Sequence, residues 1–342
     1  MERKQVICAL LLSVNGLRSD PVGRTLVWSV VLCFLLVFAG CGSVHTAQNL
    51  PTPTPTPPGP TPTPTPASTT IPAAGHVFLV LLENHGFSQV IGNAAMPYLN
   101  SLATQHALAT NYFANTHPSI GNYFMLTTGN IETNDDAFAG TISSDSIPRA
   151  FAAAGKTWKA YMESLPSVGY AGGDVYPYFK HHDPFVYLTD VLSSTAEDHD
   201  VDPFSQLASD LAAGTVPDYA FIAPNAEDDA HDCPGGVASC TDDQKLAAAD
   251  TWLKNNIDPL IHSPALSNSV FIILFDEAVD TDTTNGGGKV AMVMVGAHVK
   301  AGFKSTTFYQ HQSTLRLVLD LLRVADHPGN SATAPTMQEF FQ

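Results

Sequence analysis

Two carboxylate-containing pairs stand directly after long apolar runs. The run VFLVLL ends at Glu83 and Asn84, and the run VFIILF ends at Asp276 and Glu277. Uninterrupted apolar runs of this length predict strands that are buried on both faces of a parallel sheet. In open α/β sheets, ligands lie beyond the carboxyl ends of the strands, and buried carboxylates need a cation or a basic partner. The four residues therefore predict a metal site. Ordinary solvated strand-end residues are the alternative for either pair taken alone.

A serine in the segment Asn115–Gly129 could supply a nucleophile. Pro118 is tolerated at a helix entry but not in a helix interior, so Ser119 is expected at the start of a helix. A hydroxyl at that position lies near the positive end of the helix and its free backbone donors, which favours an alkoxide and binds phosphate. Ser119 is therefore the candidate nucleophile, and a simple N-cap is the alternative. Asn122, one turn further on, could bind a phosphoryl oxygen or satisfy a loop.

Elements that could position these residues follow from the apolar patterns of the remaining chain. Strand patterns alternate with helical patterns, which predicts an α/β fold: a single domain with a central, mostly parallel sheet flanked by helices. Ser146 and Asp242 are expected to cap two of the helices. The predicted strands are Val77–Leu82, Thr157–Tyr161, Tyr219–Ile222, Val270–Phe275 and Ala291–Val295. The predicted helices are Met96–His106, Ile120–Leu126, Ile147–Ala154, Phe204–Ala213, Asp242–Asn256 and Ser313–Leu322.

Residues 1–41 have the pattern of an export signal. Arg24 precedes an uncharged stretch, Thr25–Ala39, that ends in small residues. The segment Phe38–Cys41 resembles a bacterial lipobox, in which Cys41 becomes the lipidated first residue of the mature chain. A transmembrane anchor is the alternative, but this stretch is shorter than the roughly 20 residues that span a bilayer. The protein is therefore expected to be exported to the cell envelope and anchored as a lipoprotein through Cys41.

Residues 42–74 form a Thr-Pro-rich linker. The Thr-Pro repeats between Pro51 and Pro66 favour extended polyproline II structure and cannot build a core. The expected role is a stiff spacer between the anchor and the domain, and such stalks can also carry sugars. The remaining residues, 75–342, are sufficient for one large domain with a buried core.

Charge and cysteine content restrict the partners and the compartment. A formal net charge of −17 opposes binding to nucleic acid or to an anionic lipid surface. Membrane contact is therefore expected only through the anchor, and nucleic acid is not expected as a partner. In an exported chain, Cys233 and Cys240, which flank the short loop PGGVAS, are expected to form a disulfide. Metal ligation is the alternative, but two thiolates fall short of the four ligands of a structural zinc site.

Five segments occur in an order that resembles a known family. They include the pair at Glu83, the THPSIGNY segment around Ser119, the Asp229–Cys233 segment after a Pro-Asn pair, the FDE that ends at Glu277, and Gln310–Ser313. Together they resemble the bacterial phosphoesterase family of acid phosphatases and nonspecific phospholipases C, within the alkaline phosphatase superfamily. The resemblance covers nearly the whole domain.

The resemblance implies a metal-assisted phosphoryl transfer. Glu83, Asn84, Asp276 and Glu277 would hold a divalent metal ion that also contacts Ser119 Oγ and lowers its pKa. Ser119 would attack phosphorus and form a phosphoseryl intermediate that water hydrolyses. The carboxylate-rich ligand set suits Ca, Mn, Mg, Fe or Zn and does not distinguish among them.

Further residues acquire roles from the same resemblance. Asp229, His231 and His311 match positions that bind a second cation in two-metal relatives, and that in this family more often contact the phosphate or protonate the leaving group. Asp232 and His182 would contribute to substrate binding. The segment around His182 resembles a KHNPF motif of the family. The sequence departs from that motif at two positions, where Asp183 replaces the Asn and His181 replaces the Lys.

Two more features lie near these segments. His117 precedes the candidate nucleophile and is expected to shape the turn, with a catalytic role as the alternative. The segment Asp280–Asp282, followed by Gly286–Gly288, lacks the full spacing and the closing Glu of a calcium loop, so a flexible active-site loop is expected instead.

The leading function is hydrolysis of phosphate monoesters, with a phosphate ester as the substrate partner. A phosphodiesterase or phospholipase C would share the same nucleophile and metal, and the motifs do not separate the two. A non-catalytic surface lipoprotein is a third possibility, against which the presence of Ser119, Glu83, Asp276 and Glu277 argues. The oligomeric state does not follow from the sequence.

Overall fold

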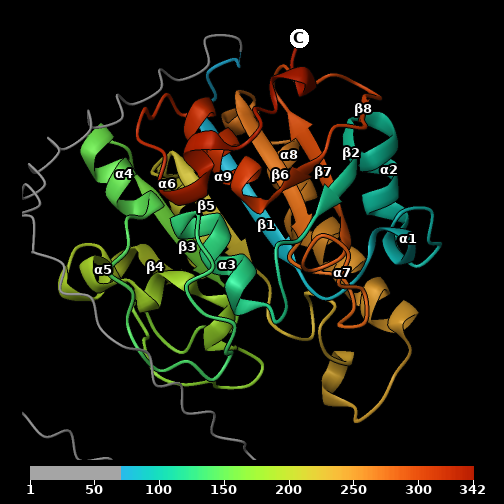
Figure 1. Cartoon of the computed structure of the whole chain (residues 1–342), viewed down its shortest axis with the longest axis horizontal. Helices are drawn as coiled ribbons and strands as arrows, with labels where there is room; N and C mark the ends of the chain where they lie inside the picture. The colour runs from blue at the N-terminus through green and yellow to red at the C-terminus, as the bar shows by residue number, and fades with distance from the viewer. Residues whose placement is uncertain (1–70) are drawn as a thin grey trace, which may run out of the picture. The chain divides into compact units, whose positions relative to one another are not determined.

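Nine strands form one mixed sheet in residues 71–342, the part of the chain that the computed structural model describes (Figure 1). The sheet order is β4-β3-β5-β1-β6-β7-β2-β8, and β9 also pairs with β2. The strands are β1 His76–Leu82, β2 Ala107–Phe113, β3 Trp158–Met162, β4 Val201–Pro203, β5 Tyr219–Ala223, β6 Ser269–Phe275, β7 Lys289–Gly296, β8 Lys304–Ser305 and β9 Tyr309–Gln310. All five predicted strands are present, whereas β2, β4, β8 and β9 were not predicted.

Strand direction brings four carboxyl ends to one edge of the sheet. Strand β1 is parallel to both β5 and β6. Strand β7 is antiparallel to β6 and to β2, so the two reversals cancel and β2 runs in the direction of β6. The loops that follow β1, β2, β5 and β6 therefore leave from the same edge, as ligand sites in such sheets require. The expected α/β domain with a mostly parallel central sheet is confirmed, with β7 as the antiparallel exception.

Helices cover both faces of this sheet. In Figure 1, α3, α4 and α9 lie in front of the sheet, and α7 and α8 lie behind it. The helices are α1 Phe87–Val90, α2 Pro97–Gln105, α3 Ile120–Thr128, α4 Ile147–Ala154, α5 Thr189–Ser193, α6 Gln206–Ala213, α7 Asp242–Asn256, α8 Asp258–Ile261 and α9 His311–Leu321. Short 3₁₀ turns span Lys180–His182, Pro184–Tyr187, Asp198–Asp200, Pro234–Gly236, Pro264–Leu266, Gly329–Thr333 and Gln338–Phe340.

Two expected helix caps differ from the structure. Helix α7 is capped by Thr241, whose hydroxyl accepts from the Gln244 amide at 3.3 Å while its own amide donates to the Gln244 side chain at 2.9 Å. Asp242 is thus the first helical residue, where its negative charge interacts favourably with the positive end of the helix dipole. Ser146 precedes α4, but its hydroxyl makes no capping hydrogen bond and is buried without a partner in the described chain.

The core explains why the central strands lack polar alternation. Every residue of β6 is buried, as is β1 from Val77 onward. Phe78 and Phe271 stack across the β1–β6 pair with ring centroids 4.5 Å apart. Each fully buried side chain of this size stabilises the fold by roughly 1.5–3 kcal/mol. Within residues 71–342, no helix has the length and hydropathy needed to cross a membrane.

The structure begins inside the segment that was expected to be linker. Ile71 is buried, and the Ala74 amide donates to the Leu321 carbonyl at 3.0 Å. Residues 71–74 therefore pack against the domain. The predicted export signal, residues 1–41, and the linker up to residue 70 lie outside the described residues.

Candidate active site

The ends of β1 and β6 bring the two predicted carboxylate pairs together. Leu82 pairs with Phe275 as the last residue of each strand, and the Asp276 amide donates to the Leu82 carbonyl at 2.9 Å. The Asn84 amide in turn donates to Asp276 Oδ1 at 3.2 Å. Asn84 has a φ of 56°, a left-handed conformation that asparagine tolerates better than most residues. The predicted convergence of these residues at one sheet edge is therefore present.

Glu83 uses its two carboxylate oxygens differently. Oε2 accepts from the Asn84 side-chain amide at 2.7 Å and from the Ser119 hydroxyl at 3.0 Å. Oε1 accepts from the Tyr123 hydroxyl at 2.5 Å and lies 3.4 Å from His182 Nε2. The carboxylate is fully buried, so these contacts replace water on both oxygens.

Ser119 occupies the N-cap position of α3 without acting as a cap. Its hydroxyl makes no capping hydrogen bond to the helix and donates to Glu83 instead. The side-chain amide of Asn84 donates to the same hydroxyl oxygen at 3.3 Å. Ser119 also lowers the pKa of Asp276, against the larger effects that raise it. The hydroxyl therefore interacts with the carboxylate cluster, which consists of Glu83, Asp276 and Glu277, and not with the backbone of the helix.

Asn122 has all of its side-chain capacity engaged by the protein. Its Oδ1 accepts from the backbone amides of Asn115 and Thr116 at 3.0 and 3.2 Å. Its Nδ2 donates to the Thr116 carbonyl at 2.9 Å and to Glu277 Oε2 at 3.1 Å. Of the two roles weighed for Asn122, the structure thus supplies the contacts of loop support.

His117, which was expected to shape the turn with a catalytic role as the alternative, is a neighbour of the cluster. Its Nδ1 lies 3.2 Å from Glu277 Oε2, and its Nε2 lies 3.0 Å from the Asp282 carbonyl. The contact with Glu277 raises the pKa of His117 to about 9, which favours the protonated ring when no metal is bound. One ligand atom each from His117, Glu277 and Asp280 lie within 4.8 Å of one another, a spacing that one cation can bridge. The expected active-site loop at Asp280–Asp282 therefore does approach the site.

Burial and mutual repulsion raise the pKa values of the clustered carboxyl groups. Burial is the largest cause for Glu83, followed by the charges of Asp276 and Asp229. The pKa of Asp276 is likewise raised, by burial and then by Glu277, and burial also raises the pKa of Glu277. Asp276 Oδ2 is buried and accepts no hydrogen bond within the described chain. The cluster therefore holds more negative charge than its described protein neighbours compensate.

The loop that follows β5 brings Asp229 next to Glu83, and Asp229 in turn contacts His182. The Glu83 amide donates to the Asp229 carbonyl at 2.8 Å, and Asp229 Oδ2 lies 3.4 Å from His182 Nδ1. His182 is thus buried between two carboxylates. Burial lowers its pKa well below the usual value, whereas burial raises the pKa of Asp229 to about 8. Asp183, which replaces the family Asn, is also fully buried.

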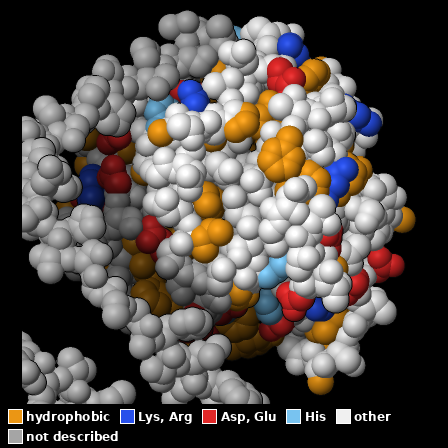
Figure 2. All heavy atoms as spheres, viewed as in Figure 1, with side chains coloured by type: hydrophobic (Ala, Val, Ile, Leu, Met, Phe, Trp, Pro, Cys, Tyr) orange, Lys and Arg blue, Asp and Glu red, His pale blue; other side chains and the backbone are white. Residues whose placement is uncertain are grey.

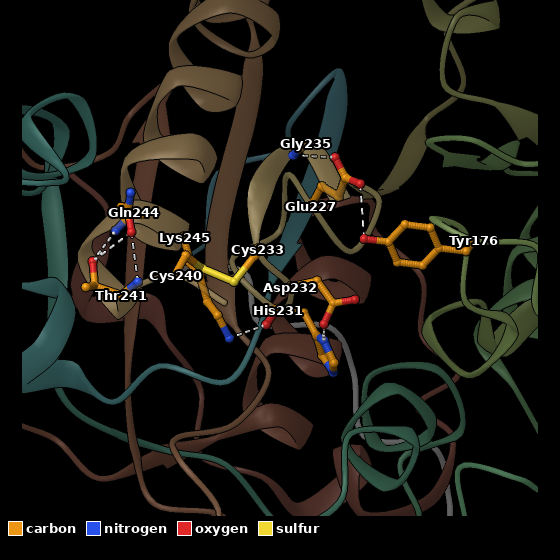
Figure 3. The surroundings of a disulfide bond; sticks show 10 residues. All are labelled: Tyr176, Glu227, His231, Asp232, Cys233, Gly235, Cys240, Thr241, Gln244 and Lys245. Carbon is orange, nitrogen blue, oxygen red and sulfur yellow. Dashed lines mark hydrogen bonds and ion pairs between the residues drawn. A yellow bond between two sulfur atoms is a disulfide. The ribbon is translucent and has the colours of Figure 1, made fainter. Parts of the chain in front are cut away.

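His231 and Asp232 lie at the partly exposed side of the site, next to the disulfide (Figure 3). The Cys233–Cys240 disulfide is present as expected. His231 Nδ1 lies 2.9 Å from Asp232 Oδ1, and Lys245 donates to the His231 carbonyl at 2.7 Å. A cavity of about 200 Å³ is lined by eight residues: Asn84, His85, Ala230, His231, Asp242, Lys245, Val279 and Asp280. His231 therefore lines the same cavity as Asn84 and Asp280.

His311 lies behind the cluster, where the structure buries it completely. Its Nε2 contacts the Asp276 carbonyl at 2.5 Å, and its Nδ1 lies 3.1 Å from the Tyr112 hydroxyl. Burial lowers the pKa of His311 to about 4. In this arrangement a neutral ring has both nitrogens engaged by the protein. The role expected for His311 in phosphate contact or proton donation stays a prediction.

Tyr123 and Lys245 were not selected from the sequence as site residues. Tyr123 follows Ser119 by four residues, so helical spacing alone places both on one face of α3. No comparable signal exists for Lys245, whose contact with the His231 carbonyl depends on how the disulfide loop returns to α7. Figure 2 shows histidine and acidic side chains together in the lower part of the visible face, where Lys and Arg are few.

Comparison with known proteins identifies the family. The profile of the Phosphoesterase family matches residues 93–325. A phosphatidylinositol-3-phosphatase from Mycobacterium tuberculosis is 27% identical over 279 residues, covering 80% of this chain and 85% of that protein. A phosphate-repressible acid phosphatase from Penicillium chrysogenum is 29% identical over 246 residues, covering 68% of this chain and 55% of that protein. The chain thus spans little more than half the length of this fungal relative.

Solved structures share the fold. A protein in the alkaline phosphatase superfamily from Vibrio parahaemolyticus superposes with a TM-score of 0.55 at 14% identity, covering 76% of this chain and 68% of that one. The sulfatase PsFucS1 from Pseudoalteromonas sp. gives a TM-score of 0.54 at 13% identity, covering 79% and 72%. The fold expected from the sequence is thereby confirmed. Because the family profile covers most of its length, the chain belongs to the phosphoesterase family and is a hydrolase that acts on phosphoester bonds.

Proposed function

We propose that this protein hydrolyses phosphate monoesters through Ser119, with a divalent metal ion held by Glu83, Asn84, Asp276 and Glu277. One observation carries the proposal: the Ser119 hydroxyl lies 3.0 Å from the buried Glu83 carboxylate and is not used to cap its helix. A serine that served only as the N-cap of a helix would accept a hydrogen bond from a backbone amide of the first turn.

The donor set fits a hard or borderline divalent cation. Asn84 makes a hydrogen bond to each of the three buried carboxylates, and Asp276 Oδ2 has no hydrogen-bond partner in the described chain. The raised pKa values of Glu83 and Asp276 reflect the same uncompensated charge. When bound, the cation would lower the pKa of the Ser119 hydroxyl and offset charge on the phosphoryl group. Ca, Mn, Mg, Fe and Zn are all compatible with these donors.

The chemistry proceeds in two displacements. Ser119 Oγ gives its proton to Glu83 Oε2, to which the hydroxyl already donates, and attacks phosphorus, so that an Oγ–P bond forms while the bond between phosphorus and the leaving oxygen breaks. Water then attacks the phosphoserine, the Oγ–P bond breaks, and inorganic phosphate leaves with the serine hydroxyl restored. Asn84 and Glu83 orient Oγ through contacts of 3.3 and 3.0 Å.

His231 is the proposed donor of a proton to the leaving oxygen. Its Nδ1 lies 2.9 Å from Asp232 Oδ1, and the residue lines the cavity next to Asn84, so Nε2 is the nitrogen left for the proposed proton transfer. A neighbouring carboxylate that fixes one imidazole nitrogen sets the tautomer of the other. In the same proposal His182 and Asp229 support Glu83 from behind, and His311 supports the backbone of Asp276.

The preference for monoesters rests on the relatives. The M. tuberculosis and P. chrysogenum relatives are both named phosphatases. Phospholipase C-type hydrolysis of a diester by the same nucleophile is the competing activity. Rates with p-nitrophenyl phosphate and p-nitrophenyl phosphorylcholine, measured after chelation and after addition of each metal, distinguish the two. Faster turnover of the diester would contradict the monoesterase proposal.

Ser119→Ala tests the nucleophile. Turnover should fall by roughly a thousandfold or more, because the covalent route is lost, while circular dichroism and bound metal are retained. Ser146→Ala is the matched control, since this buried serine also precedes a helix but its hydroxyl makes no hydrogen bond in the described chain. Activity of Ser119→Ala close to that of the control would remove Ser119 from the mechanism.

We also propose that the mature chain is anchored in the cell envelope through lipidated Cys41. The lipobox-like segment Phe38–Cys41 and the Thr-Pro-rich linker support this, and the Cys233–Cys240 disulfide suits an oxidising compartment. Labelled palmitate should be incorporated into wild type and not into Cys41→Ser. Equal labelling of both would refute the anchor.

A further inference from the structure

The hydroxyl groups of Tyr123 and Ser119 both donate hydrogen bonds to the Glu83 carboxylate. Tyr123 follows Ser119 by four residues, so both side chains lie on one face of α3. Ser119 donates to Glu83 Oε2 at 3.0 Å, and Tyr123 donates to Glu83 Oε1 at 2.5 Å. Glu83 follows β1, so this pair of contacts ties the end of a central strand to the start of α3.

The ring of Tyr123 is held in a fixed position. It is fully buried and stacks on His182, with ring centroids 5.2 Å apart and planes within 3°. Its edge packs against Phe221 of β5 at 6.1 Å. His182 itself lies 3.4 Å from Glu83 Oε1. Because the ring has no free direction in which to turn, its hydroxyl presents one donor at a defined point.

We propose that Tyr123 is a positioning residue that occupies Glu83 Oε1, so that Oε2 is the oxygen turned toward Ser119 and the metal ion. A carboxylate has two equivalent oxygens, and a donor on one of them selects the other as the ligand atom. This inference rests on the metal site of the proposed function. It assigns to Tyr123 a role that its burial alone would not require.

The alternative is that Tyr123 only fills the core. Substitution by Phe separates the two, because Phe keeps the stack on His182 and removes only the hydroxyl. Tyr161→Phe is the matched control: Tyr161 is also fully buried, and its hydroxyl donates to the Asp210 carboxylate at 2.7 Å. Asp210 is not among the residues of the candidate site.

The experiment measures metal binding and turnover separately. Chelator-treated wild type, Tyr123→Phe and Tyr161→Phe are titrated calorimetrically with Mn²⁺ and with Zn²⁺. The Kd of Tyr123→Phe should rise about 10- to 100-fold, as for other groups that orient metal ligands. Most of its activity should return at saturating metal. Tyr161→Phe should bind metal as the wild type does.

Three outcomes would overturn one claim or the other. An unchanged Kd in Tyr123→Phe, or an equal weakening in Tyr161→Phe, would reduce Tyr123 to a packing residue. Wild type that binds neither of these metals, nor Ca, Mg or Fe in the same titration, would refute the metal site of the proposed function and not only this inference. If Tyr123→Phe is less stable, the titrations are run at 10 °C on protein that circular dichroism shows to be folded, so the comparison of Kd still decides.

Discussion

The residues that form the candidate site oppose one another electrostatically. Glu83, Asp276 and Glu277 are buried together with Asp229, and the charges of the other three raise the pKa of Glu83. His117 is the cationic side chain that directly contacts Glu277. Folding therefore gathers like charges that burial makes more costly. A structure that keeps such a cluster gains from a cation, which is why metal binding and stability should be linked.

Asp276→Asn should separate these two effects. Without metal, the variant should unfold about 2 °C or more above wild type, because one charge of the buried cluster is removed. Metal affinity should fall by more than about tenfold, because a neutral amide replaces a charged ligand. Thermal denaturation in chelator, and calorimetric titration, measure the two.

Asp250→Asn is the control of opposite sign. Asp250 is buried alone and accepts from the amides of Tyr98 and Leu99 at 2.9 and 2.8 Å. An amide keeps only one acceptor oxygen there, so stability should fall by about 1 kcal/mol. If Asp276→Asn is destabilised in chelator as Asp250→Asn is, repulsion within the cluster does not limit the stability of the metal-free protein.

Sequence reasoning succeeded for residues fixed by strand ends and failed for residues fixed by tertiary contacts. The convergence of Glu83 and Asp276 follows from two buried runs in neighbouring strands. His117 gains its partner Glu277 through a fold contact that no local pattern contains. The family pattern suggested phosphate contact or proton donation for His311, which stays a prediction, and no local pattern showed that its ring nitrogens contact Tyr112 and the Asp276 backbone.

At the scale of elements, apolar content revealed the central strands and not the peripheral ones. Strand β2, with the sequence ALATNYF, mixes small and polar residues and is stabilised by pairing with β7, β8 and β9. Strands β4, β8 and β9 have only two or three residues, too few for a periodic signal. The direction of β7 could not be predicted either, because a strand buried on both faces has the same composition in either direction.

The disulfide loop is the element that borders the cavity at His231. Glu227 accepts from the Gly235 amide at 2.8 Å and from the Tyr176 hydroxyl at 3.0 Å, so the loop is tied to a second segment as well (Figure 3). Lys245 of α7 holds the His231 carbonyl from the other side. Cys233 lies two residues after His231. The disulfide therefore restrains the backbone that carries the proposed proton donor.

Replacing Cys233 and Cys240 together by Ser should lower the hydrolysis rate most for substrates with poor leaving groups. Stability should fall by about 2 kcal/mol for so short a loop. The rate with glycerol phosphate should fall more than the rate with p-nitrophenyl phosphate, because only the alkoxide needs a proton from His231. Dithiothreitol should reproduce the effect in wild type and leave the double variant unchanged. Equal losses on both substrates would argue against a link between the loop and proton donation.

At the scale of the whole molecule, the negative net charge of the chain opposes the binding of the proposed phosphate-ester substrate. The formal net charge is −17, and basic side chains are few and dispersed on the face in Figure 2. A phosphate ester approaching the site is therefore repelled at long range, so binding has to depend on local cations. Lys245 and the cationic His117 are near the site, and a bound metal ion would add the largest local charge.

The same charge distribution makes the stability of the metal-free protein depend on pH in a defined direction. The pKa of Asp229 is raised to about 8 and that of His117 to about 9 in the folded protein, and those of Glu83 and Asp276 are also raised. The folded state therefore binds more protons than the unfolded state until the pH passes these folded-state values. Stability from these groups is fully present below their unfolded pKa values and is lost as the pH rises through the folded ones.

His182 and His311 act in the opposite direction, because burial lowers their pKa values. Their contribution is lost as the pH falls below about 6.5, the unfolded value for histidine. Between about pH 6.5 and 9 the raised groups therefore dominate, and each proton of difference changes the unfolding free energy by about 1.4 kcal/mol per pH unit. The melting temperature in chelator should fall across this range.

Thermal denaturation at pH 6.5, 7.5 and 8.5 checks this expectation, with and without the metal that binds wild type best. Bound metal should reverse the slope or flatten it, because it binds the ionised carboxylates and competes with their protons. Asp276→Asn in chelator should show a shallower fall than wild type, since it lacks one of the raised groups. A melting temperature that rises with pH in metal-free wild type would mean that these carboxyl groups are not held together in the folded protein as the structure has them.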